Sequence, residues 1–207
     1  MDSAKTKNID QYKEIHAKNP GFGKSSHLKL IEIFKILKFL NLGKFNKQVS
    51  ILDFGCGKSN LSELLGSKCQ NLEGEYQFFR YDPAVPEINS IPLDSADFLI
   101  NTDVLEHIYE EDINKVLKDI FNISEICYFN ISTRLASTIL PNGENAHCTV
   151  REASWWLKKI KEFCPKAELL TSAMYEATIV TFVISKLLNF YFYINSLLPV
   201  SYTHLRA

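Results

Sequence analysis

The sequence predicts a single α/β domain in which helices cover both faces of a mostly parallel sheet. Strand-like apolar segments alternate with helix-like segments nearly throughout the chain, which is typical of parallel strands joined by helices. The 207 residues, 46% of them hydrophobic, suffice for one substantial core but argue against two. A glycine-containing turn follows the first predicted strand, and ligands of such sheets bind beyond the carboxyl ends of their strands.

Apolar periodicity places the elements in order along the chain. Helices are predicted where apolar residues recur at three- and four-residue spacing, and strands where short apolar runs end in turn-forming residues. In chain order these are a helix over Leu28 to Leu42, a strand over Val49 to Phe54, a helix around Asn60 to Leu65, strands over Glu75 to Asp82 and Ala96 to Thr102, a helical region over Asp103 to Asn122, a strand over Glu125 to Ser132, a helix over Arg151 to Cys164 and a closing strand pair over Ala167 to Ser185. The proline-bearing stretch after Asp82 leaves little room for a full crossover helix.

Charge and cysteine content restrict the partners and the compartment. The net charge of −1 supplies no global attraction for nucleic acid or for an anionic membrane, so neither is expected as a partner. Five cysteines without a CxxC pair fit neither a disulfide framework nor a zinc site, so we expect no metal. The polar N-terminus and the short, interrupted apolar stretch from Leu187 to Val200 predict a cytoplasmic protein without a membrane span.

The strongest local signal is an acid followed by two spaced glycines at the end of the first strand. Gly55 and Gly57 allow a sharp turn and let a ligand lie against bare backbone amides. Asp53 would repel a pyrophosphate but favour a sulfonium, and Asn60 replaces the third glycine of a dinucleotide fingerprint. Asp82, at the end of the second strand, is suited to accept hydrogen bonds from ribose hydroxyls. The alternative for both acids is a turn-forming role, since Asp is common in turns.

These residues carry a resemblance to the class I S-adenosylmethionine-dependent methyltransferases of the small, compact type. The matching segments are ILDFGCGKSNL, FFRYDPAVPEI and DFLINTDVLEHI, in that order. The resemblance implies a Rossmann-like three-layer sandwich with a mostly parallel seven-stranded sheet whose last strand is antiparallel. It implies S-adenosylmethionine as cofactor, with contacts from Asp53, Gly55, Cys56, Gly57, Asp82, Pro83, Thr102 and Asp103. Ser59 replaces a family glycine, and the short link after Asp82 leaves Glu87 or Asn89 as candidates for contacting adenine.

The resemblance also divides the chain into three parts. Residues 46–186 would form the methyltransferase catalytic domain, and residues 1–45 an N-terminal arm and helix that could act as a lid. Residues 187–207 are an apolar C-terminal segment, and 200–207 have the character of non-native read-through. Tyr12, His16 and Phe22 belong to the arm and could fold over the cofactor, although simple packing explains them equally well.

Two histidines are candidates for a general base, should the acceptor have to lose a proton. His107 and His147 both follow predicted strands on the ligand side, and imidazole titrates near neutrality. Packing is the alternative for His107, whereas His147 lies in a polar loop of the kind that often carries function. Trp155 and Trp156 could line an acceptor pocket, but adjacent helical residues point about 100° apart, so at least one should be core.

The expected function is methyl transfer to a small molecule, with a hydroxyl of a sugar, glycan precursor or other metabolite as the acceptor. The near-neutral charge favours such an acceptor over RNA. Two alternatives remain at the level of sequence. One is a nicotinamide-dependent oxidoreductase, and the other is a methyltransferase-like binding subunit that has lost turnover.

Overall fold

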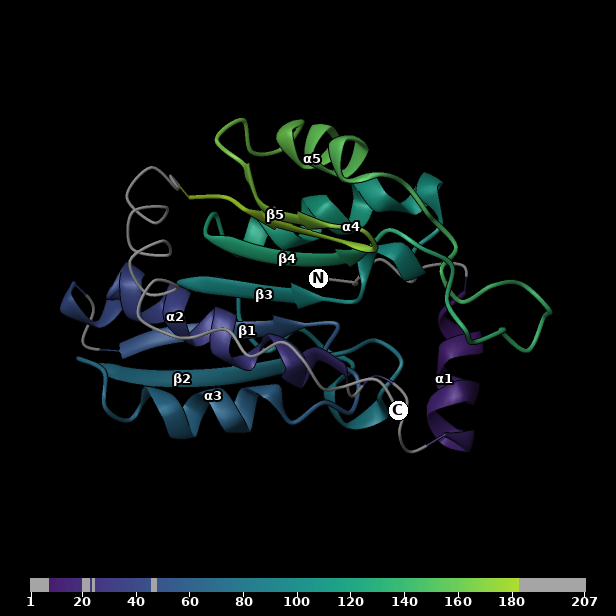
Figure 1. The fold of residues 1–207 in the computed structure, drawn as a ribbon. Coiled ribbons are helices and arrows are strands. Elements are labelled where there is room, and N and C mark those ends of the chain that lie inside the picture. The colour runs from purple at the N-terminus through teal and green to yellow at the C-terminus, as the bar shows by residue number, and fades with distance from the viewer. Residues whose placement is uncertain (1–7, 20–22, 24, 46–47, 183–207) are drawn as a thin grey trace, which may run out of the picture.

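A computed structural model describes residues 8–19, 23, 25–45 and 48–182. In this part of the chain the sheet has six strands in the order β2-β1-β3-β4-β6-β5 (Figure 1). The strands are β1 (Gln48–Phe54), β2 (Glu75–Tyr81), β3 (Phe98–Thr102), β4 (Cys127–Ser132), β5 (Glu168–Ala173) and β6 (Glu176–Val180). The first four run parallel, whereas the last strand, β6, is antiparallel to both of its neighbours, β4 and β5. The predicted closing strand pair is therefore confirmed.

Among the described residues, the sheet lacks the seventh strand that the resemblance implied. The chain between β2 and β3 forms only a short 3-10 turn over Pro86–Ile88. Pro83, Pro86 and Pro92 lie in this link, and proline cannot donate a hydrogen bond to a neighbouring strand. The Rossmann-like α/β class is nevertheless confirmed, with β2 as the edge strand beside β1.

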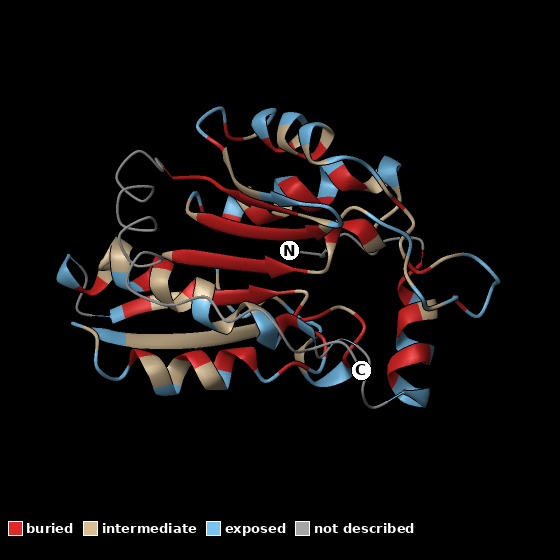
Figure 2. Cartoon of the chain, viewed as in Figure 1, coloured by how far each residue is buried: buried red, intermediate tan, exposed pale blue. Residues whose placement is uncertain are grey.

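Helices cover both faces of the sheet, as predicted. On one face, α2 (Leu30–Leu40) and α3 (Leu61–Cys69) enclose a core that includes Ile51, Phe98 and Tyr128. On the other, α4 (Glu110–Ile123) and α5 (Ala153–Lys161) enclose a core that includes Leu52 and Phe129. Because successive strand residues point to opposite faces, the central strands must be apolar at almost every position. Figure 2 shows them as almost wholly buried.

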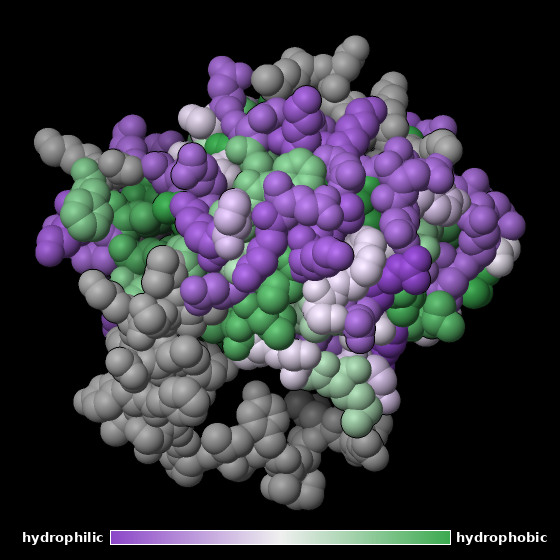
Figure 3. All heavy atoms as spheres, turned by 90° about the horizontal axis from the view of Figure 1, so that it is seen from above, coloured by the Kyte–Doolittle hydropathy of each residue, from purple (hydrophilic) through white to green (hydrophobic). Residues whose placement is uncertain are grey.

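The outer surface of the α4 and α5 layer is mostly polar. Seen from above, this face carries hydrophilic side chains with smaller hydrophobic areas between them (Figure 3). Polar outer faces and apolar inner faces are what the amphipathic periodicity of α4 and α5 predicts. No helix of the described residues is both long and apolar enough to cross a membrane. The apolar stretch from Leu187 to Val200 lies outside the described residues.

One helix in the N-terminal arm was not predicted. Residues Ile9–Lys18 form α1, which lies at the end of the sheet toward which the parallel strands point (Figure 1). Its buried residues Ile9, Tyr12 and Ile15 pack with Ala84 from the link after β2 and with Leu140 and Ala146 from the loop after β4. The helix is short and its apolar stripe is narrow, so it depends on these tertiary contacts for its stability.

Candidate functional site

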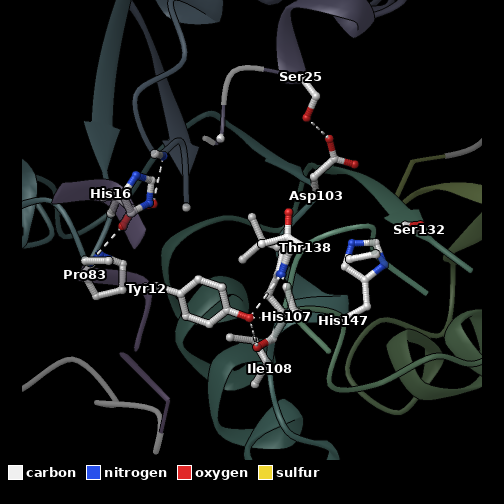
Figure 4. Close-up of a pocket in the computed structure, with 18 of the residues that line it drawn as sticks. Tyr12, His16, Ser25, Pro83, Asp103, His107, Ile108, Ser132, Thr138 and His147 are labelled. Atoms are coloured by element: carbon white, nitrogen blue, oxygen red, sulfur yellow. Dashed lines mark hydrogen bonds between the residues drawn. The ribbon is translucent and has the colours of Figure 1, made fainter. Parts of the chain in front are cut away.

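A cavity of about 820 Å³ lies at the carboxyl ends of the parallel strands, between them and α1 (Figure 4). Its volume is typical of small-molecule and cofactor sites. Residues that end or follow four different strands line it, from Phe54 at the end of β1 to Ser132 at the end of β4. The location agrees with the expectation that strand ends carry the ligand site in this class of sheet.

The glycine turn lines the cavity directly. Gly55 and Gly57 have φ values of 78° and 53°, a region that residues with a side chain seldom adopt. The backbone N–H of Gly55 donates a 2.7 Å hydrogen bond to the carbonyl of Tyr81, which ties the turn to β2. A methyl group on Gly55 would lie 2.6 Å from Cγ2 of Val104, so this glycine is also needed for packing. Bare backbone is therefore presented to whatever occupies the cavity.

Asp82 joins the glycine turn to the link that follows β2. Its Oδ2 accepts a 2.8 Å hydrogen bond from the N–H of Gly57, and its Oδ1 accepts one of 2.8 Å from the N–H of Ala84. The side chain is buried yet lines the cavity together with Pro83. Each carboxylate oxygen has a second lone pair, so Asp82 can hold the turn and still accept a bond from a ligand hydroxyl.

Asp53 lies behind the glycine turn and does not line the cavity. Its side chain is on the α3 side of the sheet, where Ser62 donates a 3.1 Å hydrogen bond to Oδ2. Burial raises the pKa of Asp53 to about 7, and the bond from Ser62 only partly opposes this. Direct attraction between this carboxylate and a bound sulfonium, the basis of the sequence argument, is not supported by this placement.

Several other predicted contacts also lie outside the cavity wall. Cys56 and Thr102 are buried beside the turn and at the end of β3, and neither Glu87 nor Asn89 lines the cavity. By contrast, Asp103 does line it, with φ 54°, and its Oδ2 accepts a 2.7 Å hydrogen bond from Ser25. The adenine-contacting role proposed for the link after β2 therefore has no support from Glu87 or Asn89.

Helix α1 forms the wall opposite the strand ends. The hydroxyl of Tyr12 donates a 2.7 Å hydrogen bond to the carbonyl of Ala146, which attaches the helix to the loop before α5. The side chain of His16 faces the glycine turn, since a methyl group on Gly57 would lie 3.2 Å from its Cε1. Burial lowers the pKa of His16, and the Asp82 carboxylate opposes this. Phe22 lies outside the described residues.

His107 and His147 meet at the far end of the cavity (Figure 4). Their ring centroids are 4.8 Å apart with the planes nearly perpendicular. Nδ1 of His107 lies 2.9 Å from the carbonyl oxygen of Ala146, and Nδ1 of His147 lies 2.5 Å from that of Arg134. Burial, with a smaller contribution from His147, lowers the pKa of His107 to about 4, so this imidazole is neutral at pH 7 and a weak base.

The two tryptophans take no part in the cavity. Trp156 is fully buried in the core between the sheet and α5, and Trp155 packs against the same core with its ring edge toward Trp156. The expectation that at least one is core is confirmed, and neither lines an acceptor pocket.

The segment that closes the cavity after β4 was not predicted from the sequence. Ser132 and the residues from Arg134 to Thr138 line this side. The rule that strand ends carry the site could have identified Ser132, but the loop beyond it shows no motif. Among the described lining residues the charged groups are Asp82, Asp103, Asp119 and Arg134, so carboxylates outnumber guanidinium groups by three to one.

Solved structures of methyltransferases share this fold. The structure matches 1,6-didemethyltoxoflavin-N1-methyltransferase of Burkholderia thailandensis, determined with 1,6-didemethyltoxoflavin and S-adenosylhomocysteine, with a TM-score of 0.52 and 9% identity, over 84% of this chain and 88% of that one. It matches the methyltransferase domain of bacterial CtHen1 with a TM-score of 0.50 and 16% identity, over 74% and 97% of the two chains. No family model and no curated protein matches the sequence. The chain therefore has the Rossmann-like fold of the class I S-adenosylmethionine-dependent methyltransferases.

Proposed function

We propose that this protein transfers a methyl group from S-adenosylmethionine to a small-molecule acceptor bound in the same cavity. The observation that carries the proposal is the cavity itself, where a bare glycine turn and a strand-end carboxylate, Asp82, stand beside a second strand-end carboxylate, Asp103. The fold shared with known methyltransferases supports it.

The charge of the cavity fits a cationic, phosphate-free donor. Three aspartates and one arginine among the described lining residues make the wall acidic. Such a wall attracts a sulfonium and an ammonium but repels the pyrophosphate of a nicotinamide dinucleotide. Asp82 and Asp103 face the cavity, whereas Asp53 does not. We therefore assign to Asp82 and Asp103 the attraction of the sulfonium that the sequence predicted for Asp53.

The residues present fit the adenosyl donor in kind. Gly55 and Gly57 offer backbone without side chains, and Asp82 retains lone pairs for two adjacent ribose hydroxyls while it holds the N–H groups of Gly57 and Ala84. Pro83 and Tyr81 add apolar surface beside the same strand end. Asp103 is exposed at its carboxylate to the cavity and suits the ammonium group of the donor.

The donor supplies an electrophilic methyl group on a sulfonium with a good leaving group. The protein must therefore align the acceptor and keep water out, and alignment alone can lower a barrier by about 7–11 kcal/mol. Tyr12 and His16 close the cavity from α1, and His107 and His147 form its far wall. His107 is too weak a base at pH 7 to take a proton from an alcohol unaided.

We further propose a hydroxyl-bearing metabolite, such as a sugar or glycan precursor, as the acceptor. The cavity of about 820 Å³ has room for a drug-sized donor plus a small acceptor, and not for a folded polymer. Polar groups at the acceptor end, including Ser132, Ser137 and Thr138, can form hydrogen bonds with hydroxyls.

All five cysteines are free, which is consistent with the cytoplasmic location that we expect.

Calorimetric titration with S-adenosylmethionine, S-adenosylhomocysteine and NADH tests the proposal. We expect saturable binding of both sulfur compounds and none of NADH, and the reverse pattern would overturn it. Asp103→Asn keeps the backbone conformation, because Asn tolerates positive φ, and should weaken donor binding. Asp94→Asn, at an exposed position outside the cavity, is the matched control and should bind the donor normally.

A screen of hydroxyl-bearing metabolites for release of S-adenosylhomocysteine then tests turnover. Release with one acceptor class would support methyl transfer and identify the acceptor. Tight donor binding without release across sugars, nucleosides, phenols and amines would favour the binding subunit over the enzyme.

A further inference from the structure

A cluster of metal-ligating side chains stands at the acceptor end of the cavity. Glu106 and His107 belong to a 3-10 turn over Leu105–His107 that follows β3, and His147 comes from the loop before α5. One ligand atom from each of the three residues lies within 4.8 Å of the others. Ligand atoms of one tetrahedral ion lie about 3.4 Å apart, so side-chain rotations that shorten these separations by up to about 1.4 Å would bring all three into one coordination shell.

The contacts of both imidazoles favour the tautomer that leaves Nε2 available to a metal ion. A carbonyl oxygen can only accept a hydrogen bond, so the short contacts from Nδ1 of His107 to Ala146 and from Nδ1 of His147 to Arg134 favour Nδ1–H in both rings. Nδ1 of His107 also lies 3.2 Å from the hydroxyl of Tyr12, which itself donates to the carbonyl of Ala146. In a neutral ring the lone pair is then on Nε2. Metal-binding histidines are typically oriented in this way, with the other ring nitrogen donating to a backbone carbonyl or a carboxylate.

Glu106 has a buried oxygen that the protein leaves unsatisfied. The residue is 0% exposed, and its Oε1 accepts a 2.8 Å hydrogen bond from the N–H of Ser132. Its Oε2 is also buried and makes no hydrogen bond with any residue that the structure describes. A cation beside Oε2 would give this buried oxygen the partner that it lacks among the described residues.

From this geometry we propose that Glu106, His107 and His147 bind one first-row transition-metal dication, such as Zn²⁺ or Mn²⁺. Two imidazoles and a carboxylate suit these ions, whereas Ca²⁺ takes oxygen ligands almost exclusively. The expectation of no metal was based on cysteine spacing, and it did not consider a carboxylate and imidazoles that meet only in the folded chain.

The ion would face the cavity, because His107 and His147 line it while Glu106 lies behind them. Three protein ligands leave coordination positions for an oxygen of a bound molecule. An acceptor hydroxyl bound at such a position would lose its proton more readily, a consequence that rests on the proposed function.

Metal binding by the full-length protein tests this proposal without reference to activity. The protein is treated with EDTA, desalted and titrated by calorimetry with ZnCl₂, MnCl₂ and CaCl₂ in separate experiments. We expect Zn²⁺ or Mn²⁺ to bind at one ion per chain and to raise the melting temperature, and Ca²⁺ to do neither. Absence of stoichiometric Zn²⁺ and Mn²⁺ binding would overturn the proposal.

Two variants locate the site. Glu106→Gln keeps a carbonyl oxygen for the N–H of Ser132 but removes the charge, so the protein should fold without metal while its affinity for the ion falls. His147→Ala, in a loop, should have the same effect. We expect at least a tenfold loss in each, because even indirect support of a ligand is worth about 10–100-fold in affinity.

His27→Ala is the matched control, since His27 is exposed and does not line the cavity. Wild-type metal affinity in Glu106→Gln and His147→Ala, or an equal loss in His27→Ala, would refute the assignment. Titration of the same preparations with S-adenosylmethionine separates the two proposals. Metal binding without donor binding would overturn only the methyltransferase function, and donor binding without metal binding only the metal site.

Discussion

The buried carboxyl of Asp53 should make the protein less stable as the pH rises toward neutrality. Its pKa is about 7 in the folded chain, compared with 3.8 for a freely exposed aspartate. Between these values the folded state holds a proton that the unfolded state has released, so the stability contributed by this group falls with rising pH. A difference of about three pKa units corresponds to about 4 kcal/mol above pH 7.

Asp53→Asn removes this titration and isolates its contribution. Other acids and histidines titrate in the same range, but their contributions cancel when the variant is compared with the wild type at each pH. The difference in unfolding free energy between variant and wild type should shift by roughly 2–3 kcal/mol in favour of the variant from pH 5 to pH 8. The absolute gain should be smaller, because the amide places an N–H₂ group where Oδ1 has no hydrogen-bond partner.

Urea denaturation followed by circular dichroism at pH 5, 6, 7 and 8 measures this difference. Ser62→Ala is a useful companion, since loss of the bond to Oδ2 should raise the pKa of Asp53 further and steepen the loss of stability. If the difference in unfolding free energy between Asp53→Asn and the wild type is the same at all four pH values, Asp53 titrates normally and the reasoning is refuted.

Three further substitutions test the turn, the α1 wall and the core. Gly55→Ala should cost more than about 1 kcal/mol and weaken donor binding, because φ is 78° and the new methyl would lie 2.6 Å from Val104; unchanged urea and calorimetric titrations would contradict this. Tyr12→Phe should lower stability by about 1 kcal/mol through loss of the bond to Ala146, and an unaltered thermal melt would show that this bond contributes little. Trp156→Ala, which empties a fully buried site, should cost about 3–5 kcal/mol in urea denaturation; a cost below 1 kcal/mol would mean that the core refills.

Asp53 shows that a place near the end of a strand is not enough to predict contact with a ligand. The sequence correctly places this acid at the end of a strand before a glycine turn. Side chains alternate along a strand, so Asp53 shares a face with Ile51 and points toward α3, whereas the cavity lies beyond the strand end. Alternation does not separate Asp53 from Asp82, because Asp53 pairs with Arg80, two residues before Asp82. The two acids differ because Asp53 lies within β1, under α3, whereas Asp82 follows the last residue of β2 and so reaches the cavity.

Helix α1 shows the opposite case, in which local pattern was insufficient. Ile9, Tyr12 and Ile15 are buried only because two distant segments, the link after β2 and the loop after β4, pack against them. An isolated helix of ten residues is marginal in water, so nothing local distinguishes this arm from an unstructured one.

The sequence by itself determined the α/β class, the order of the elements, the glycine turn and the carboxylate at the end of β2, because these depend on periodicity and on residues close together in the chain. Only the tertiary structure decided which side chains face the cavity, the packing of α1 across it and the meeting of Glu106 and His107 with His147. These contacts join segments far apart in the chain, and their geometry depends on how loops pack on the finished sheet.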